Sequence, residues 1–160
     1  MEIAKSTERA HKDILQLVTF NIGEEEFGMD IMHVKEIIRM MEITKVPKSP
    51  EFVDGVINLR GNVVPIIDLR KRFSMAGKDR DKNTRISVVE LGGTIVGFVV
   101  DSVHEVLRIP TDTVEPPPPV VAGIDSDYIK GVGKLDDRLL ILLDLQKLLS
   151  REEREALDNV

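Results

Sequence analysis

The chain has 160 residues but contains no cysteine and no tryptophan, and aromatic residues make up only 4% of it. Without cysteine there is no disulfide framework, no thiolate metal site and no thiol nucleophile, and the composition fits a reducing cytoplasm. No apolar run approaches the roughly 20 residues that a membrane-spanning helix needs, and the polar N-terminal sequence lacks the apolar core of a signal peptide. We therefore expect a cytoplasmic protein that does not insert into a membrane.

Basic charge is also scarce. Lysine and arginine number 22 against 28 acidic residues, and the net charge is −6 at pH 7. Because a nucleic-acid binder needs a basic face for the phosphate backbone, we do not expect nucleic acid as a partner. The hydrophobic fraction of 42% is enough for a core. The length predicts one compact unit or two small lobes that share that core.

Recognisable catalytic motifs are missing as well. The chain has no glycine-rich phosphate loop and no GxSxG elbow. The three histidines, His11, His33 and His104, lack the close spacing of a metal-ligand pair. Asp68 and Asp144 follow apolar runs, where a turn or helix cap explains them better than acid–base catalysis. We predict a protein that is not an enzyme and has no metal site and no cofactor.

What the chain does contain is an internal repeat. The segment Phe20–Arg39 matches Val89–Arg108 at a constant offset of 69 residues, which pairs Gly28 with Gly97. A repeat of this length indicates a duplicated supersecondary unit.

The repeat continues in the stretch around which the chain is organised. Residues 55–71 match residues 131–147 at an offset of 76, and the extra residues fall in the proline-rich segment 116–127. Within the first copy, the stretch from Val56 to Phe73 reads as two strands around a turn at Arg60-Gly61-Asn62, where glycine can adopt a positive φ. We expect the second strand, which is almost entirely apolar, to be covered on both faces. The turn directs Arg60 outward, where a solvated charge is the simplest role.

Each copy therefore predicts about five short strands, which is typical of a small barrel, and two such barrels should pack through their apolar faces. The domain is expected at residues 17–150. Its lobes are placed at about 17–74 and 84–150, and an exchanged terminal strand is left open. We expect residues 1–16 to be a tail or short helix and residues 151–160 to be a C-terminal tail.

Some segments are ambiguous between helix and strand. Helical spacing over Ile31–Ile38 indicates a short helix in the first copy, followed by a strand at Ile43–Val46. In the second copy, Val103–Ile109 is interpreted as a continued strand. The end segments Ala10–Gln16 and Asp144–Leu157 are also compatible with helices.

Four blocks of the sequence resemble one known family. They are VKEIIR, GVINLRGNVVPIIDLRKRF, GFVVDSVHEVLRI and IKGVGKLDDRLLILLDLQKLL, in that order along the chain. Together they resemble CheW, the coupling protein family of bacterial chemotaxis, over Leu17 to about Leu149. The resemblance implies a mainly β fold of two five-stranded Src-homology-type barrels on a shared core, with short helices at the ends.

The same resemblance implies a non-catalytic scaffold. CheW proteins couple the cytoplasmic tips of transmembrane chemoreceptors (methyl-accepting chemotaxis proteins) to the regulatory domain of the histidine kinase CheA. We therefore expect a cytoplasmic adaptor at membrane-associated receptor arrays. The alternative is a double-barrel module that binds peptides in another signalling complex.

In the family, the receptor lies in the groove between the barrels, and six positions here match that site. Val34, Ile37 and Val64 are expected to supply an apolar floor for a helix in the groove, although ordinary core positions would explain Val34 and Ile37 equally well. Glu36 and Arg60 are expected to match charge at the rim or to bind each other. No residue is assigned to kinase binding. The implied receptor-binding residues are Val34, Glu36, Ile37, Arg60, Gly61 and Val64.

Overall fold

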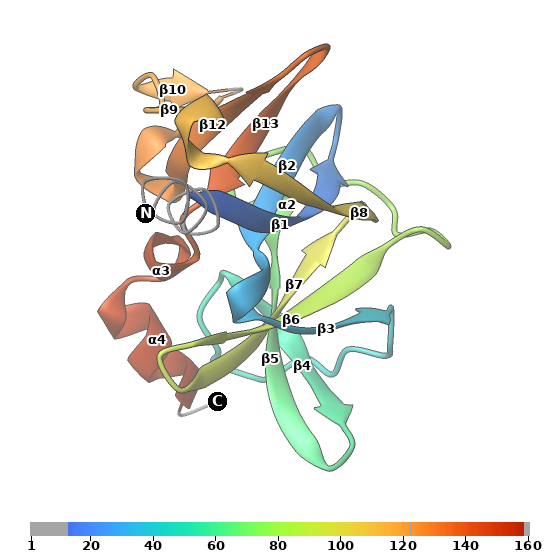
Figure 1. Ribbon diagram of the computed structural model, residues 1–160. Coiled ribbons are helices and arrows are strands. Elements are labelled where there is room, and N and C mark those ends of the chain that lie inside the picture. Colours follow the sequence, from blue (N-terminus) through green and yellow to red (C-terminus); the bar gives the residue numbers. More distant parts are fainter. Residues whose placement is uncertain (1–12, 122, 159–160) are drawn as a thin grey trace, which may run out of the picture.

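The computed structural model describes residues 13–121 and 123–158, and Figure 1 shows how its elements are arranged. The elements in chain order are β1 (Ile14–Ile22), β2 (Glu25–Asp30), η1 (Ile31–His33), β3 (Val34–Arg39), β4 (Val53–Leu59), β5 (Asn62–Asp68), α2 (Leu69–Arg72), β6 (Arg85–Leu91), β7 (Thr94–Val100), β8 (Ser102–Pro110), η2 (Thr111–Thr113), β9 (Val114–Glu115), β10 (Val120–Val121), β11 (Ile124–Asp125), η3 (Ser126–Tyr128), β12 (Ile129–Leu135), β13 (Arg138–Leu143), α3 (Leu145–Leu148) and α4 (Arg151–Asp158).

The strands form two large sheets and one small hairpin, β10–β11. The first sheet has the order β8-β1-β2-β13-β12-β9 and the second has the order β3-β6-β7-β5-β4. Each sheet curls into a barrel. The chain segment that follows one edge strand, β8 or β3, pairs with the strand at the opposite side of the same sheet. In the first sheet β9, which comes after β8, pairs with β12; in the second, Thr44, which comes after β3, bridges to Val56. We call these sheets barrel 1 and barrel 2, and the predicted mainly β, double-barrel fold is confirmed.

The two barrels have the same internal order, and this order crosses the sequence repeat. β3, β6, β7, β5 and β4 of barrel 2 correspond to β8, β1, β2, β13 and β12 of barrel 1. Barrel 1 therefore takes its hairpin β1–β2 from the first copy and β8, β12 and β13 from the second. Barrel 2 takes its hairpin β6–β7 from the second copy and β3, β4 and β5 from the first. The lobes at 17–74 and 84–150 consequently do not correspond to separate sheets, and the exchanged piece is a hairpin rather than a terminal strand.

The central strands β5 and β13 face two clusters each. On β5, Ile66 lies in a cluster inside barrel 2, whereas the next residue, Ile67, lies in a cluster shared by both barrels. On β13, Leu142 lies in a cluster inside barrel 1 and Leu143 in the shared cluster. Because successive strand residues point to opposite faces, both strands are buried on both sides, as the apolar runs predict.

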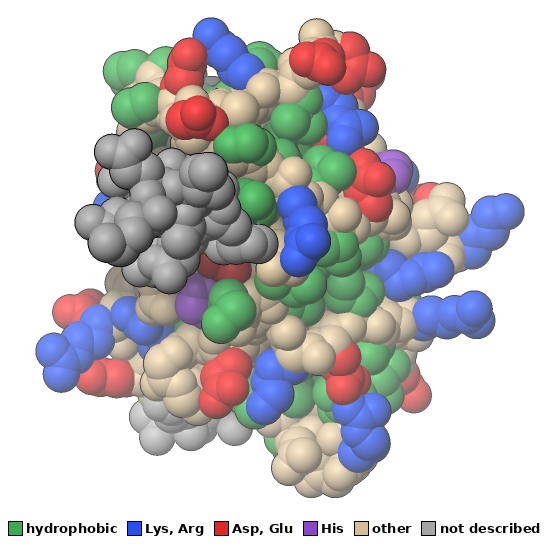
Figure 2. Space-filling view, in the orientation of Figure 1, with side chains coloured by type: hydrophobic (Ala, Val, Ile, Leu, Met, Phe, Trp, Pro, Cys, Tyr) green, Lys and Arg blue, Asp and Glu red, His purple; other side chains and the backbone are tan. Residues whose placement is uncertain are grey.

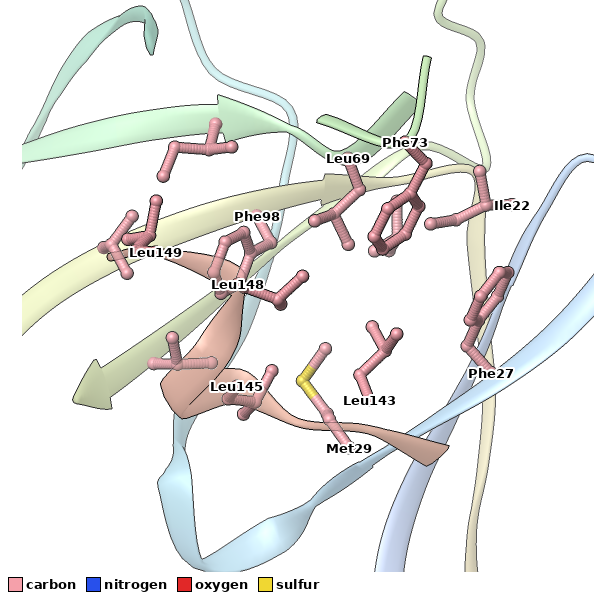
Figure 3. Close-up of a cluster of buried hydrophobic side chains, with 14 of the residues drawn as sticks. Ile22, Phe27, Met29, Leu69, Phe73, Phe98, Leu143, Leu145, Leu148 and Leu149 are labelled. Atoms are coloured by element: carbon pink, nitrogen blue, oxygen red, sulfur yellow. The ribbon is translucent and has the colours of Figure 1, made fainter. Parts of the chain in front are cut away.

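The shared cluster is the largest and joins the two barrels. Phe27 and Met29 enter it from barrel 1, Phe98 enters it from barrel 2, and Leu148 covers it from α3 (Figure 3). All four side chains are at most 1% exposed. Truncating one such side chain to alanine lowers the free energy of unfolding by about 2–5 kcal/mol. Because the cluster is built from side chains of both barrels, we expect the two barrels to unfold as a single unit.

Three local predictions differ from the structure. The predicted helix over Ile31–Ile38 is wrong, because only Ile31–His33 forms a 3₁₀ turn and β3 follows it. The predicted strand Ile43–Val46 is reduced to an isolated bridge at Thr44. The predicted helix at Ala10–Gln16 is wrong from residue 14 onward, where β1 begins, and residues 10–12 lie outside the described part of the chain. By contrast, β8 confirms the continued strand of the second copy.

The C-terminal segment is part of the packed structure rather than a loose tail. Ser150 caps α4, since its hydroxyl accepts a hydrogen bond from the Glu153 backbone N–H at 3.0 Å. The Glu153 carboxylate accepts two bonds from the guanidinium of Arg72, each of 2.7 Å, and Leu157 is only 2% exposed. The predicted helical character of Asp144–Leu157 is present as two short helices, α3 and α4.

Two glycines that match in the repeat lie in the parallel strand pairs of the two barrels. Gly28 on β2 pairs with Leu142, and Gly97 on β7 pairs with Ile66. A Cβ atom built at Gly97 would lie 2.6 Å from Ile66 Cδ1 and 2.7 Å from Ile86 Cγ2, far inside contact distance. At Gly28 the nearest atom would be Leu142 Cδ2 at 3.2 Å, so a methyl group would clash at Gly97 and be tightly packed at Gly28.

We predict that Gly97→Ala lowers the free energy of unfolding by about 1–3 kcal/mol through overpacking. Urea denaturation measures the change. Gly77→Ala is the matched control, because nothing lies within 4 Å of a Cβ placed there. Equal stability of the two variants would contradict the close packing.

An ion pair also ties the barrels together. Arg70, on α2, donates from Nε to Asp101 Oδ1 at 3.0 Å, and the backbone N–H of Gly23, in the β1–β2 turn, donates to Asp101 Oδ2 at 2.8 Å. Burial alone would raise the pKa of Asp101, but these hydrogen bonds outweigh burial and hold the pKa below its ordinary value.

Because the folded-state pKa of Asp101 is depressed, its ionised form stabilises the fold above the unfolded pKa of about 3.9. That stabilisation is lost as the pH falls through the folded-state pKa. We predict that Asp101→Asn lowers the urea midpoint at pH 7 and that the difference from the unsubstituted chain shrinks as the solution is acidified below about pH 4. Asp136→Asn, at an exposed turn, is the control. A difference that stays constant with pH would contradict this role.

Candidate functional site

The β4–β5 turn is built from two residues in the left-handed region. Arg60 has φ +51° and Gly61 has φ +87°, whereas Asn62 already belongs to β5. This is the two-residue hairpin that suits the twist of paired strands. Asn58 Oδ1 accepts a hydrogen bond from the Gly61 backbone N–H at 2.8 Å and fixes the turn. A positive φ is uncommon for arginine, so the turn holds this cation in a conformation that local preference alone does not favour.

The guanidinium of Arg60 pairs with the carboxylate of Glu36 on β3. β3 and β4 are the two edges of the barrel 2 sheet, so the ion pair spans the seam where the barrel closes. The Arg60 side chain is 69% exposed and that of Glu36 is 32% exposed. An ion pair this exposed is worth at most about 1 kcal/mol. Both charges are therefore open to an incoming partner at small cost to the fold.

The other implied receptor-binding residues divide into exposed and buried positions. Ile37 is 36% exposed and Gly61 is exposed at the turn. Val34 is half-buried against the shared cluster. Val64 is only 3% exposed and belongs to the cluster inside barrel 2. Glu36, Ile37, Arg60 and Gly61 thus reach the surface, but Val64 is a core residue.

Barrel 1 carries a matching arrangement that the sequence analysis did not single out. Glu105 on β8 is the repeat mate of Glu36, and its Oε1 lies 3.1 Å from an Arg138 guanidinium nitrogen. Val106, the mate of Ile37, is 54% exposed. Val103, the mate of Val34, packs against the shared cluster. Adding the repeat offset of 69 to the numbers of Val34, Glu36 and Ile37 identifies these three residues from the sequence alone.

β3 and β8 thus flank the shared cluster, each with an inner valine, a paired glutamate and an exposed aliphatic residue. Hydrophobic side chains gather on the face that carries these two strands, and charged side chains surround them (Figure 2). We call this surface the interbarrel face and define it by Val34, Glu36, Ile37, Arg60, Val103, Glu105 and Val106.

Comparison with known proteins gives this geometry a family. A family model described as the CheW-like domain matches residues 16–153. The chain belongs to the CheW family. It is 42% identical over 145 residues to the chemotaxis protein CheW of Klebsiella aerogenes, a match that covers 91% of this chain and 87% of that one. The corresponding protein of Treponema pallidum is 37% identical over 153 residues, which cover 91% and 88% of the two chains.

A solved CheW structure has the same fold. The crystal structure of the scaffolding protein TtCheW from Thermoanaerobacter tengcongensis superposes with a TM-score of 0.79 at 43% sequence identity, covering 85% of this chain and 88% of that one. CheW proteins are scaffolds and not enzymes, and the function of this chain is that of a non-catalytic adaptor in chemotaxis signalling.

Two observations on the described residues accompany this assignment. Within residues 13–121 and 123–158, no His, Asp and Glu side chains come together in a group that could hold a metal ion. Across the same residues, no helix has the length and apolar character needed to cross a membrane.

Proposed function

We propose that the chain couples chemoreceptors to the histidine kinase CheA, with the interbarrel face as the docking surface for the cytoplasmic receptor tip. That tip is an antiparallel helical bundle in the systems the family serves. The observation that carries the proposal is the accessible Glu36–Arg60 ion pair beside exposed Ile37 on β3. A helix can place apolar residues over an aliphatic patch while polar residues at its margin meet fixed charges.

The chain then acts mechanically. Receptor and kinase bind different parts of one rigid double barrel, and a change in the placement of the receptor is passed to the kinase without a chemical step. The shared cluster supports this mode, because it joins the barrels through buried side chains of both. The protein would work in the cytoplasm at membrane-associated receptor arrays.

We predict that Arg60→Ala folds normally but weakens binding to a soluble receptor-tip fragment about tenfold, since an interfacial charge that meets its partner is worth 1–2 kcal/mol or more. Glu36→Ala should have a smaller effect, of about a kilocalorie or less. Titration calorimetry measures both affinities.

Arg151→Ala is the matched control, because this arginine on α4 is 89% exposed and, among the described residues, its ion pair is with Glu155 of the same helix at 3.5 Å. If Arg60→Ala binds the fragment as tightly as the control does, the interbarrel face is not the receptor site.

The kinase contact is proposed at an exposed apolar strand end. Val63 is the second residue of β5 and Leu139 the second residue of β13; they are repeat mates and are 62% and 59% exposed. The β4–β5 and β12–β13 turns beside them lie at opposite ends of the molecule (Figure 1). A barrel-to-barrel contact with the CheA regulatory domain needs a compact apolar patch of this kind.

We predict that one of the two substitutions Val63→Glu and Leu139→Glu abolishes capture of the CheA regulatory domain in a pull-down and leaves capture of the receptor tip intact. Charging an exposed position should not unfold the protein. Met32→Glu is the control, because Met32 is 84% exposed on η1. Full kinase capture by both variants would place the contact elsewhere.

A further inference from the structure

A small pocket opens beside barrel 1, between η1, the strands β1, β2 and β13, and the start of α3. None of the residues that define the interbarrel face lines it. Leu15, Leu17 and Leu142 form apolar parts of its wall, and polar groups come from Asp30 and Asp144, among others. The remaining lining residues are Gly28, His33, Lys130, Leu143, Leu145 and Gln146.

The corresponding position in barrel 2 is filled by an arginine. Arg80, from the connection between the two copies, reaches Asp54 Oδ2 at 2.6 Å and Asp68 Oδ2 at 3.3 Å. Asp68 uses its other oxygen to accept the backbone N–H of Arg70 at 2.9 Å and so caps α2. The side chains of Asp54 and Asp68 are only 13% and 16% exposed, so this guanidinium is held at a largely covered carboxylate pair.

The repeat relates the two positions residue by residue. Asp144 is the mate of Asp68 and does the same local work, since its Oδ1 accepts the backbone N–H of Gln146 at 3.2 Å and caps α3. Among the described residues, none forms an ion pair with Asp144. Asp30 adds a second carboxylate to the pocket, whereas Lys130, the mate of Asp54, is exposed.

We propose that this pocket binds the guanidinium of an arginine presented by a partner polypeptide, between the carboxylates of Asp144 and Asp30 and over the leucine wall. Barrel 2 indicates the class of ligand. There Asp68, the repeat mate of Asp144, binds the arginine side chain of Arg80. The charge of the pocket also favours a cation, because its lining includes two carboxylates, Asp30 and Asp144, and one lysine, Lys130. The small pocket suits the head group at the end of a side chain. Lys130 weakens the site relative to that of barrel 2, as expected for a contact that must form and dissociate.

The test is an NMR titration of the full chain with N-acetyl-L-arginine amide, followed on backbone amides. The neutral isostere N-acetyl-L-citrulline amide is the ligand control. We expect saturable shifts at the amides of Gly28 and Gln146 with the arginine probe only. Asp144→Asn keeps the oxygen that caps α3 but removes the charge, so it should weaken binding about tenfold. Lys130→Asp recreates the carboxylate pair of barrel 2 and should tighten binding.

Asp136→Asn, at an exposed turn outside the pocket, should bind like the unsubstituted chain. Equal shifts with both probes, no saturable shift, or an Asp144→Asn variant that binds unchanged would overturn the proposal. The chain also has basic residues before β1, at Arg9 and Lys12. If the probe binds only after both are replaced by alanine, the pocket serves the chain's own side chains and not a partner's. The Lys130→Asp result keeps the test decisive should Asp144→Asn fold poorly.

Discussion

The burial of strands on both of their faces is the constraint on which the rest of this structure depends. β5 and β13 each place alternate residues inside their own barrel and into the shared cluster, so neither barrel can be removed without exposing the apolar surface of the other. Exchange of the hairpins β1–β2 and β6–β7 adds covalent connections to this packing. The result is a joined pair of barrels whose edges β3 and β8 flank one face, and that face is where we propose that a partner docks.

Duplication gave the two barrels one backbone plan and different surfaces. Both present a glutamate in an ion pair and an exposed aliphatic residue on the edge strand. They differ beside the helices that follow β5 and β13, where Arg80 fills the acidic position of barrel 2 and a pocket remains in barrel 1. The internal repeat thus gives the two barrels a related framework and different surface chemistry.

Sequence reasoning could recover the repeat, the double barrel and the doubly buried β5, because alternation and glycine spacing carry that information. It failed at β3. Val34 faces the shared cluster and Ile38 the interior of barrel 2, and the register shift between Val34 and Glu36 gives these residues a spacing that imitates a helix. The repeat mate β8, interpreted as a strand, could have corrected this. Hairpin exchange depends on long-range pairing, which a local pattern does not encode.

The most direct test of the receptor-docking claim is amide hydrogen exchange of the full chain with and without a soluble receptor-tip fragment. The account predicts slower exchange in β3, β8 and the β4–β5 turn, with little change in the central strands, which are already protected. Protection confined to α4, the β10–β11 hairpin or the strands β9 and β12 of barrel 1 would contradict docking on the interbarrel face.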